Sequence, residues 1–270
     1  AQMDTKLTNR LKHCETLSHD SYEKLWAAIF QSDKELVIGQ QEYGRQHKQR
    51  FWELCNALGE LIKGNPKPKV LEFGVSEFSA IYRQLFPNIS LDCADRPSAE
   101  DYIGFNKKTS LTVSGGEQFI AVDLNKPCVL LHNDYHYLHG NYDIVIFTEV
   151  LEHLTANPVD ILKQLIALLA PQGSLYLTTP NFFRLENREQ FHLQENPQEI
   201  YPSGENNWDA HHHHREYGLK EMLRFTEQAG GRTKAFYFSD CWDNSTVNND
   251  SEKANMVFVI QSDKSTENAS

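Results

Sequence analysis

An alternation of strand and helix patterns after residue 68 restricts the fold more than any other feature of this sequence. Short runs of strand-forming residues alternate there with longer runs in which apolar residues recur at helical spacing. The predicted strands cover residues 70–73, 90–94, 119–122, 142–147 and 174–178, and the predicted helices cover residues 79–86, 159–169 and 219–229. Because strands that alternate with helices are joined by right-handed crossovers, the sequence predicts an α/β fold with a doubly wound, mostly parallel sheet.

Two further strand patterns near the C-terminus enlarge this sheet. Residues 234–238 and 256–260 are rich in strand formers, and we expect them to close the sheet as a hairpin-like pair, which makes it seven-stranded. Gly230 and Gly231 follow the last predicted helix and are typical of its C-terminal cap. Ligands of open α/β sheets bind at the carboxyl ends of the strands, so the functional residues are expected there.

The chain before the sheet has a different character. Residues 1–66 contain no strand pattern, whereas apolar residues have helical spacing in residues 22–30 and 51–62. We therefore predict an N-terminal helical cap that contributes to substrate binding. Pro66 and Pro68 mark its end, since two prolines this close together cannot continue a helix.

The α/β domain is predicted to span residues 67–262. Within it, residues 181–213 form a polar connection that is rich in asparagine and interrupted by prolines. Since ordinary connections have about 4–6 residues, we interpret this long segment as an active-site loop. Residues 263–270 are predicted to be a disordered tail.

Composition limits the classes of function. A hydrophobic content of 40% supports a folded core, and no apolar stretch approaches the roughly 18–20 residues of a membrane span. The first residues lack the apolar region of a signal peptide, so a cytoplasmic protein is expected. Five cysteines without Cys-x-x-Cys spacing favour reduced packing thiols over disulfides or a zinc knuckle. The net charge of −11 disfavours duplex nucleic acid and favours a small-molecule partner.

Acidic residues end three successive predicted strands. Glu72 is followed by Gly74, which lets the backbone turn tightly and approach a nucleotide-like ligand. Asp95 ends the second strand, where a carboxylate can accept hydrogen bonds from both hydroxyls of a ribose, and Asp123 ends the third, where it can accept one from an adenine amino group. One such residue is often only a turn or cap residue, but three in succession indicate a nucleoside-binding edge. Thr148, which ends the fourth strand, joins this set.

From about residue 69 to residue 260 the pattern resembles the class I S-adenosylmethionine-dependent methyltransferases. Their first motif is an acidic residue followed by alternate glycines, which Glu72 and Gly74 match, whereas Ser76 and Phe78 stand where further glycines are usual. A dinucleotide-binding protein is the alternative, but the G-x-G-x-x-G motif is missing. The resemblance implies a Rossmann-like sheet and the cofactor S-adenosylmethionine, bound by Glu72, Gly74, Ser76, Asp95, Asp123 and Thr148.

The departures from the glycine motif affect one end of the donor. Phe78 would crowd the loop, so the methionine end is expected to be bound differently. Tyr43 and Arg45 in the cap are candidates for binding its carboxylate, with a role on the helix surface as the alternative.

A second cluster, Glu149-Val150-Leu151-Glu152-His153, follows the fourth strand. On a helix, Glu149, Glu152 and His153 would share one face, because positions i, i+3 and i+4 lie side by side. Two carboxylates and an imidazole at a strand's carboxyl end can hold a cation. The alternative is that these residues cap the helix and face solvent.

This cluster, residues 178–181 and the histidine tract before Tyr217 together resemble the small-RNA 3′-terminal 2′-O-methyltransferases, and similar stretches occur in the ubiquinone-pathway O-methyltransferases. The resemblance implies a divalent metal (Mg, Mn, Fe or Zn) that grips the substrate's hydroxyls. Carried over by position, its ligands are Glu149, Glu152, His153 and His213. The match is imperfect at Arg215, where an aromatic residue is usual, so His212 and His214 stay open as alternative ligands. The catalytic base is expected among His153, His212, His213 and His214.

These patterns predict S-adenosylmethionine-dependent methylation of a hydroxyl on a small molecule, with assistance from the metal. The sulfonium donor is already activated, so the protein must align a nucleophile and remove its proton. Metal-independent N-, O- or C-methylation with a histidine base is one alternative, and a non-catalytic donor-binding regulatory protein is another. An RNA 3′ end stays open as an acceptor, although no RNA-binding domain accompanies the pattern. The sequence identifies neither the acceptor nor the oligomeric state.

Overall fold

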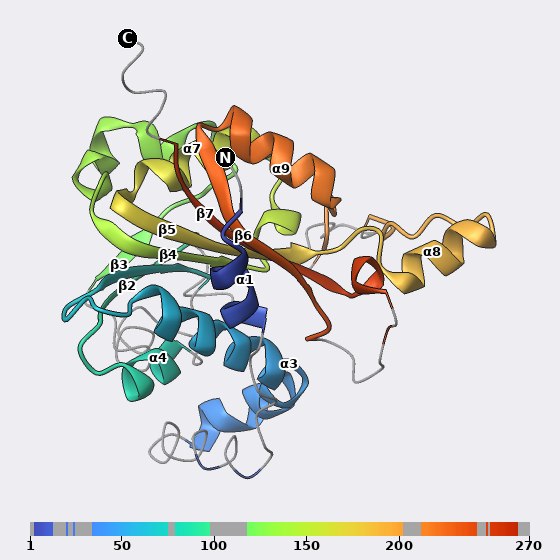
Figure 1. Ribbon diagram of the computed structural model, residues 1–270, viewed down its shortest axis with the longest axis horizontal. Helices are drawn as coiled ribbons and strands as arrows, with labels where there is room; N and C mark the ends of the chain where they lie inside the picture. The colour runs from blue at the N-terminus through green and yellow to red at the C-terminus, as the bar shows by residue number, and fades with distance from the viewer. Residues whose placement is uncertain are drawn as a thin grey trace.

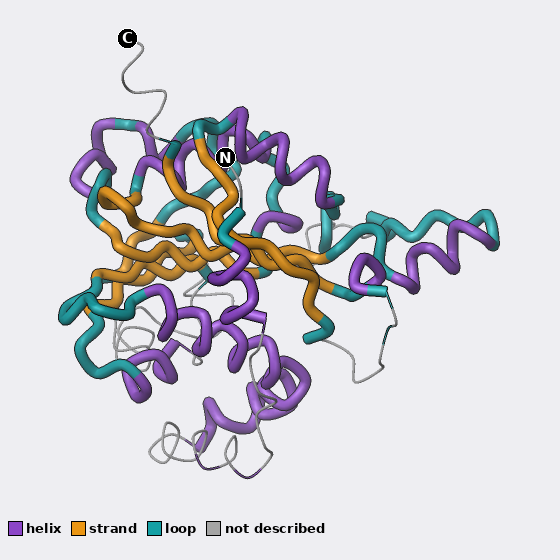
Figure 2. The backbone as a smooth tube through the Cα atoms, viewed as in Figure 1, coloured by secondary structure: helices purple, strands orange, loops and turns teal. Residues whose placement is uncertain are grey.

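A seven-stranded sheet runs through the centre of the molecule (Figure 1, Figure 2). The computed structural model describes residues 3–12, 20, 24, 34–74, 79–97, 118–201, 212–241, 247 and 249–263. The strands are β1 (Lys69–Phe73), β2 (Ser90–Asp95), β3 (Phe119–Ala121), β4 (Tyr142–Thr148), β5 (Leu169–Pro180), β6 (Gly231–Ser239) and β7 (Asn255–Ser262). They are ordered β3-β2-β1-β4-β5-β7-β6, and neighbours are parallel except that β7 is antiparallel to both β5 and β6. The predicted fold class is confirmed.

Helices cover both faces of this sheet (Figure 1). One face carries α1 (Thr5–Lys12), α3 (Lys34–Leu61) and α4 (Ser79–Leu85), the other carries α7 (Pro158–Ala167) and α9 (Leu219–Gln228), and α8 (Leu185–His192) projects to the side. Each face has its own apolar core, the first around Leu58 and Tyr82 and the second around Leu162 and Met222. Because β4 is covered on both sides, residues 144–147 are all buried, as expected for a central parallel strand.

Capping residues set the ends of the helices that cover the second face. The Asn157 side chain accepts a hydrogen bond from the Val159 N–H at 2.9 Å, and Pro158 occupies the first turn of α7. Gly230 has a φ of +78° and follows the end of α9, as the sequence predicted.

Several elements differ from the predicted pattern. The helix predicted over residues 51–62 is the end of the much longer α3, and α8 lies within the segment predicted as a loop. Short 3-10 helices, η1 (Val129–Leu131) and η2 (Asn133–Leu138), occupy a stretch for which no element was predicted. The helix predicted over residues 22–30, except for Lys24, and the tail beyond Asp263 lie outside the described residues.

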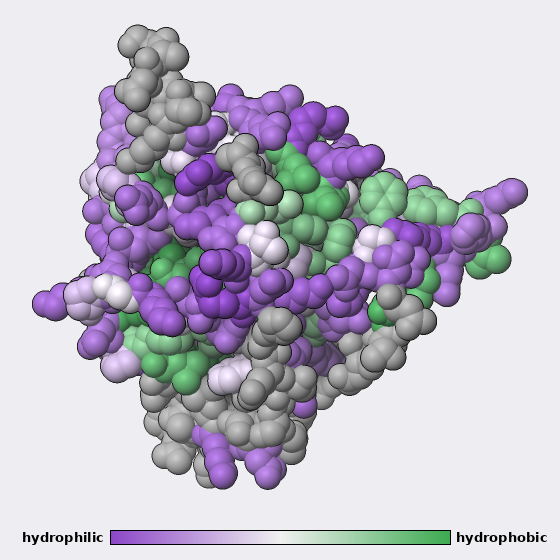
Figure 3. All heavy atoms as spheres, viewed as in Figure 1, coloured by the Kyte–Doolittle hydropathy of each residue, from purple (hydrophilic) through white to green (hydrophobic). Residues whose placement is uncertain are grey.

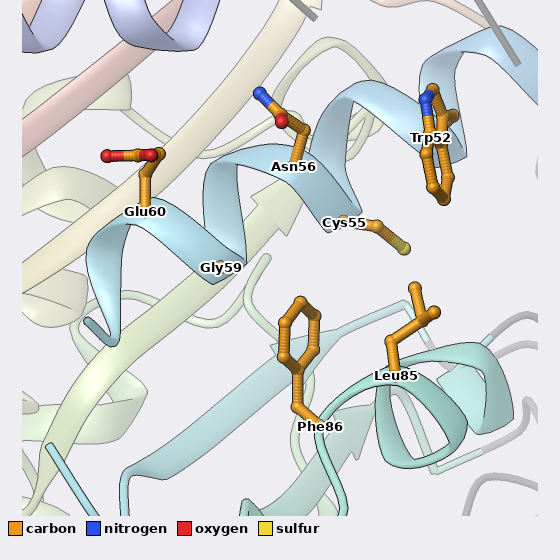
Figure 4. A pocket seen from close by; sticks show the side chains of 7 residues that line it. All are labelled: Trp52, Cys55, Asn56, Gly59, Glu60, Leu85 and Phe86. Atoms are coloured by element: carbon orange, nitrogen blue, oxygen red, sulfur yellow. The ribbon is translucent and has the colours of Figure 1, made fainter. Parts of the chain in front are cut away.

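A groove of about 310 Å³ lies between α3 and α4 (Figure 4). Its lining consists of Trp52, Cys55, Asn56, Gly59, Glu60, Leu85 and Phe86. The Phe86 carbonyl accepts a hydrogen bond from the Ile89 N–H at 3.1 Å, directly before β2, so the groove lies toward the amino ends of the strands. The predicted functional residues lie at the opposite end of the sheet.

No helix in the described part of the chain is both long and apolar enough to span a lipid bilayer.

Candidate active site

The carboxyl ends of β1 and β4 form the topological switch point of the sheet, because the chain proceeds from these neighbours in opposite directions. Gly74 directly follows β1 with a φ of +81°, a left-handed conformation that glycine adopts at little cost. Its N–H donates to the Ala94 carbonyl at 3.0 Å, and the residue is exposed. A ligand can therefore approach the backbone closely at this turn.

Glu72 is buried, with 3% of its surface exposed, and its carboxylate is engaged within the protein. It accepts hydrogen bonds from the hydroxyls of Ser79 and Tyr82, the latter at 2.9 Å. Burial raises the pKa of Glu72 to about 7, although these hydrogen bonds and the charge of Arg50 act in the opposite direction. Glu72 thus ties the end of β1 to α4 and supports the turn at Gly74.

Asp95 and Asp123 lie at the same edge, and both are half-buried. Asp95 ends β2 and accepts a hydrogen bond from the Arg96 N–H at 2.7 Å, while its carbonyl accepts one from the Val122 N–H at 2.8 Å. Asp123 accepts a hydrogen bond from the Asn125 N–H at 3.0 Å, which stabilises the turn after β3. The ends of the neighbouring strands β2 and β3 therefore each carry a carboxylate.

Arg50, which the sequence analysis missed, reaches this edge from α3. Its side chain is buried, its Nη1 lies 3.5 Å from Thr148 Oγ1, and its guanidinium lies 4.5 Å from the centroid of the Phe51 ring. The sequence contained a signal, because Arg50 precedes the buried Leu54 and Leu58 at i+4 and i+8 and so occupies the core-facing side of the helix. A buried cation at a ligand-binding edge can bind an anionic group. The side chains of Tyr43 and Arg45 and the whole of Ser76 and Phe78 lie outside the described residues.

The segment after β4 is not the helix that the sequence predicted. Glu149 has a left-handed backbone with a φ of +54°, and only a 3-10 turn, η3 (Leu151–His153), follows it. Glu149 Oε1 accepts hydrogen bonds from Thr178 Oγ1 at 2.6 Å and from Asn255 Nδ2 at 2.8 Å, so the carboxylate is held against β5 and β7. The expected helical face is therefore wrong, because a left-handed residue breaks the helical register. The assignment of Glu149 as a metal ligand stays a prediction.

Glu152, His153 and His213 nevertheless converge. One ligand atom from each lies within 4.8 Å of the other two, and the two imidazole rings pack edge to face with centroids 4.8 Å apart. Glu152 is fully buried, and its Oε2 accepts a hydrogen bond from Thr179 Oγ1 at 3.1 Å. Its Oε1 lies 3.9 Å from His153 Nε2 and has no hydrogen-bond partner among the described residues. The structure thus brings together three of the four residues predicted as metal ligands, which we call the Glu152 cluster.

Both histidines of the Glu152 cluster are anchored through Nδ1. The Nδ1 atom of His153 lies 3.0 Å from the His212 carbonyl oxygen, and that of His213 lies 2.9 Å from Glu216 Oε1. Nε2 is therefore the nitrogen that the His213 ring can offer to a cation or a proton. Burial acts to lower the pKa of His213, but the hydrogen bond and charge of Glu216 outweigh it and raise the pKa above its ordinary value.

The pKa of the Glu152 carboxyl group is strongly perturbed. Burial raises its pKa well above the ordinary range, and the nearby Glu149 carboxylate adds to this effect. A cation bound beside Glu152 would reverse this balance, because it would favour the ionised form.

His212 and His214 lie next to the Glu152 cluster. The Nδ1 atom of the buried His212 is 3.2 Å from Glu199 Oε2, and the His214 N–H donates to the Glu152 carbonyl at 2.8 Å. Burial, together with the neighbouring His212, lowers the pKa of His214. His214 is therefore neutral at neutral pH and can accept a proton. His211 lies outside the described residues.

The segment that carries α8 reaches this group of histidines. The Tyr201 ring near its end lies 5.0 Å from the His212 ring and 6.1 Å from the His214 ring, measured between centroids. Exposed apolar side chains occur along the segment, as the space-filling view shows (Figure 3). They are Phe183, Leu185, Phe191, Leu193, Ile200 and Tyr201.

A family model described as "Methyltransferase domain" matches residues 45–230, which is more than half of the chain. No curated protein matches the sequence at a significant level. The structure resembles the methyltransferase CalH in complex with SAH, with 17% identity, a TM-score of 0.53, and coverage of 95% of this chain and 72% of that chain. It also resembles magnesium protoporphyrin IX methyltransferase from Synechocystis PCC 6803, with 15% identity, a TM-score of 0.52, and coverage of 89% of this chain and 94% of that chain.

A third similar structure is 1,6-didemethyltoxoflavin-N1-methyltransferase from Burkholderia thailandensis, with 13% identity, a TM-score of 0.50 and coverage of 92% of both chains. The chain spans 61% of the length of a structure from Galdieria sulphuraria and 59% of the length of the CurJ carbon methyltransferase. At identities this low the likeness shows a shared fold, whereas the family match shows the family. The chain therefore belongs to the methyltransferase domain family and has a seven-stranded Rossmann-like sheet.

Proposed function

We propose that this methyltransferase uses S-adenosylmethionine to methylate a hydroxyl group of a small molecule, with assistance from a divalent cation. The observation that carries the proposal is the convergence of Glu152, His153 and His213 beside the switch point of the sheet. The similar structures of CalH, the protoporphyrin enzyme and the toxoflavin enzyme each contain S-adenosylhomocysteine, the demethylated form of this donor.

The proposed donor site follows the edge formed by β1, β2 and β3. In this proposal Asp95 accepts hydrogen bonds from the ribose hydroxyls and Asp123 accepts one from the adenine amino group. Gly74 allows the donor to lie against the backbone. Arg50 offers a buried positive charge for the methionine carboxylate, and Thr148 lies within reach of that guanidinium.

The Glu152 cluster fits a small divalent cation. It offers one carboxylate and two imidazoles, a mixed oxygen and nitrogen set that suits Mn, Fe or Zn and, with added water, Mg. Glu152 Oε1 is a buried acceptor without a hydrogen-bond partner among the described residues, which a cation would satisfy. Anchoring of a histidine through Nδ1 is also common among metal ligands.

When bound, a divalent cation would lower the pKa of an acceptor hydroxyl and orient it. The chain's own residues supply the remaining steps. Glu152 and the two histidines would hold this cation near the end of β4, so that the acceptor oxygen lies next to the proposed donor site. His214 is neutral at neutral pH and can remove the hydroxyl proton, with His212 as the alternative base.

A second candidate is metal-independent methylation, in which a histidine acts as the base alone. It is favoured by the position of Glu149, whose carboxylate is held by Thr178 and Asn255 outside the Glu152 cluster. Only three of the predicted ligands then remain close together.

The proposal is tested by turnover. The purified protein is incubated with S-adenosylmethionine and metabolite extracts, and products heavier by one methylene group are identified by mass spectrometry. A chelator should then abolish activity, and Mg, Mn, Fe, Co or Zn should restore it to differing degrees, while calorimetric binding of the donor changes little. Full turnover in the presence of chelator would instead support the metal-independent candidate. Products methylated only on nitrogen or carbon would contradict O-methylation.

A further inference from the structure

Glu216 makes two side-chain contacts that join separate parts of the structure. Its Oε1 lies 2.9 Å from His213 Nδ1, and its other oxygen accepts a hydrogen bond from the Arg184 guanidinium, directly before α8. The Glu216 side chain is largely buried, with 12% exposed, and the Arg184 side chain has 21% exposed. Burial acts to raise the pKa of Glu216, but the hydrogen bonds from His213 and Arg184 outweigh it and lower the pKa, so the carboxylate is charged.

Arg184 is in turn held by the framework of the sheet. Its Nη1 also donates to the Asn181 carbonyl at 3.2 Å. Asn181 directly follows β5, forms a parallel bridge with Tyr217, and donates to the Lys253 carbonyl at 2.9 Å. Asn181, at the end of β5, therefore fixes both the backbone beside Glu216 and the Arg184 side chain that binds the Glu216 carboxylate.

The histidine tract is held from its other side by Glu152. The Glu152 carbonyl accepts the His214 N–H at 2.8 Å, which fixes the backbone but not the rotation of the His213 ring. That rotation is set by the Nδ1 contact with Glu216, because an imidazole held at Nδ1 presents Nε2 on its opposite side. With Nδ1 in contact with Glu216, Nε2 is the nitrogen that His213 can offer to the Glu152 cluster.

We propose that Glu216, held in place by Arg184, is a positioning residue that fixes the tautomer and orientation of His213 in the Glu152 cluster. The inference deepens the proposed function and rests on the role assigned there to this cluster. An ordinary structural ion pair would stabilise the fold without affecting the His213 ring. Arg184 contributes by balancing the charge of Glu216, since Glu149 and Glu152 already bring two carboxyl groups close to the site.

Nuclear magnetic resonance of protein labelled with ¹⁵N-histidine tests the proposal without any metal. At alkaline pH the metal-free wild type should show His213 in the Nδ1–H tautomer. Glu216→Ala should lose this preference, and Glu216→Gln should retain part of it, since its amide oxygen can still accept the hydrogen bond. Glu186→Gln is the matched control, because the Glu186 carboxylate lies 3.6 Å from Arg184 but is 75% exposed and, in the described part of the chain, forms no hydrogen bond or ion pair with His213.

Binding of Co²⁺ alone, followed by calorimetry and visible absorption, provides the second measurement. Glu216→Ala should weaken Co²⁺ binding by about 10–100-fold, Arg184→Gln by less, and Glu186→Gln not measurably. An unchanged His213 tautomer in a folded Glu216→Ala variant would overturn the positioning role. If the wild type binds no Co²⁺, the metal assistance in the proposed function fails, while the tautomer measurement still decides the role of Glu216.

Discussion

Asp95 is the single residue that tests the donor site most directly. Replacing Asp95 with alanine removes an acceptor from two ribose hydroxyls, which is worth roughly 1.5–3 kcal/mol, so S-adenosylmethionine should bind at least about tenfold more weakly. Calorimetric titration of the folded variant measures the loss. Asp123→Ala should cost less, because only one adenine contact is removed. The reverse ranking would show that the ribose and adenine assignments are exchanged.

Glu152 and Glu149 are separated by two residues but have different environments. Glu152 Oε1 faces His153, whereas Glu149 is held by Thr178 and Asn255. We therefore expect Glu152→Gln to lower turnover and Co²⁺ affinity together by about tenfold or more, and Glu149→Gln to lower them less.

The histidine tract can also bind metals nonspecifically, so His211→Ala serves as the control and should leave both quantities nearly intact. Equal losses in Glu149→Gln and Glu152→Gln would show that Glu149 is a ligand as well, as the sequence predicts.

The sequence predicted that Glu152, His153 and His213 lie close together, but it did not predict the backbone conformation that brings them together. The spacing of Glu149, Glu152 and His153 indicates a shared face only if the backbone is helical, and the left-handed conformation of Glu149 leaves no mark in that spacing. Arg50 was missed because a charged residue in a helix is usually solvated, and only the phase of its buried neighbours indicates otherwise.

At the scale of elements, β5 depends on a glycine within an irregular stretch. β4 pairs Tyr142 with Leu169 and Ile144 with Ser174, so the residues between Leu169 and Ser174 bulge outward. A Cβ atom at Gly173 would lie 2.6 Å from the Tyr142 carbonyl oxygen and 2.9 Å from the Ala170 carbonyl oxygen. Backbone atoms cannot move aside easily, so Gly173→Ala should reduce the free energy of unfolding by about 1–3 kcal/mol.

Urea denaturation of Gly173→Ala beside Gly140→Ala checks this expectation. Gly140 has a φ of +67° and no atom within 4 Å of its added Cβ, so alanine there should cost only the backbone strain of about 1 kcal/mol. A smaller effect at Gly173 than at Gly140 would contradict the steric argument.

Strongly periodic elements were predictable, and elements set by tertiary contacts were not. The strands were placed to within three residues, except that β5 begins five residues earlier than predicted, because their apolar runs are bounded by turn residues. In helix α8 the one buried residue is the polar Asn187, so the sequence has no apolar face from which this helix could be predicted. The 3-10 helices η1 and η2 are too short to produce a period.

At the scale of the whole molecule, the residues that build the core and the residues of the candidate site lie at different parts of the sheet. Apolar residues build a core on each face, and the polar residues predicted from strand ends gather at one edge. The fold class follows from general rules of α/β proteins, which is why sequence patterns were sufficient for it. The identity of the methyl acceptor could not be predicted from the sequence, because no general rule relates the sequence of the segments around the site to the molecule that they bind.

Global stability should depend on pH through Glu72, whose folded-state pKa of about 7 lies above its ordinary value of 4.5. The folded protein binds the proton more tightly than the unfolded chain, so the stabilisation from this group is complete below about pH 4.5 and is lost as the pH rises toward about 7. Glu72→Gln lacks this titration. Urea unfolding at about pH 5 and about pH 8 should therefore show that wild type loses more stability than Glu72→Gln over this interval. Other buried carboxyl groups, such as Glu152, contribute equally to the pH dependence of both proteins, so their contributions cancel in the comparison. If the wild type instead gained more stability than Glu72→Gln between about pH 5 and about pH 8, the effect of Arg50 on the pKa of Glu72 would exceed that of burial. The Glu72 carboxylate would then be ionised in the folded protein.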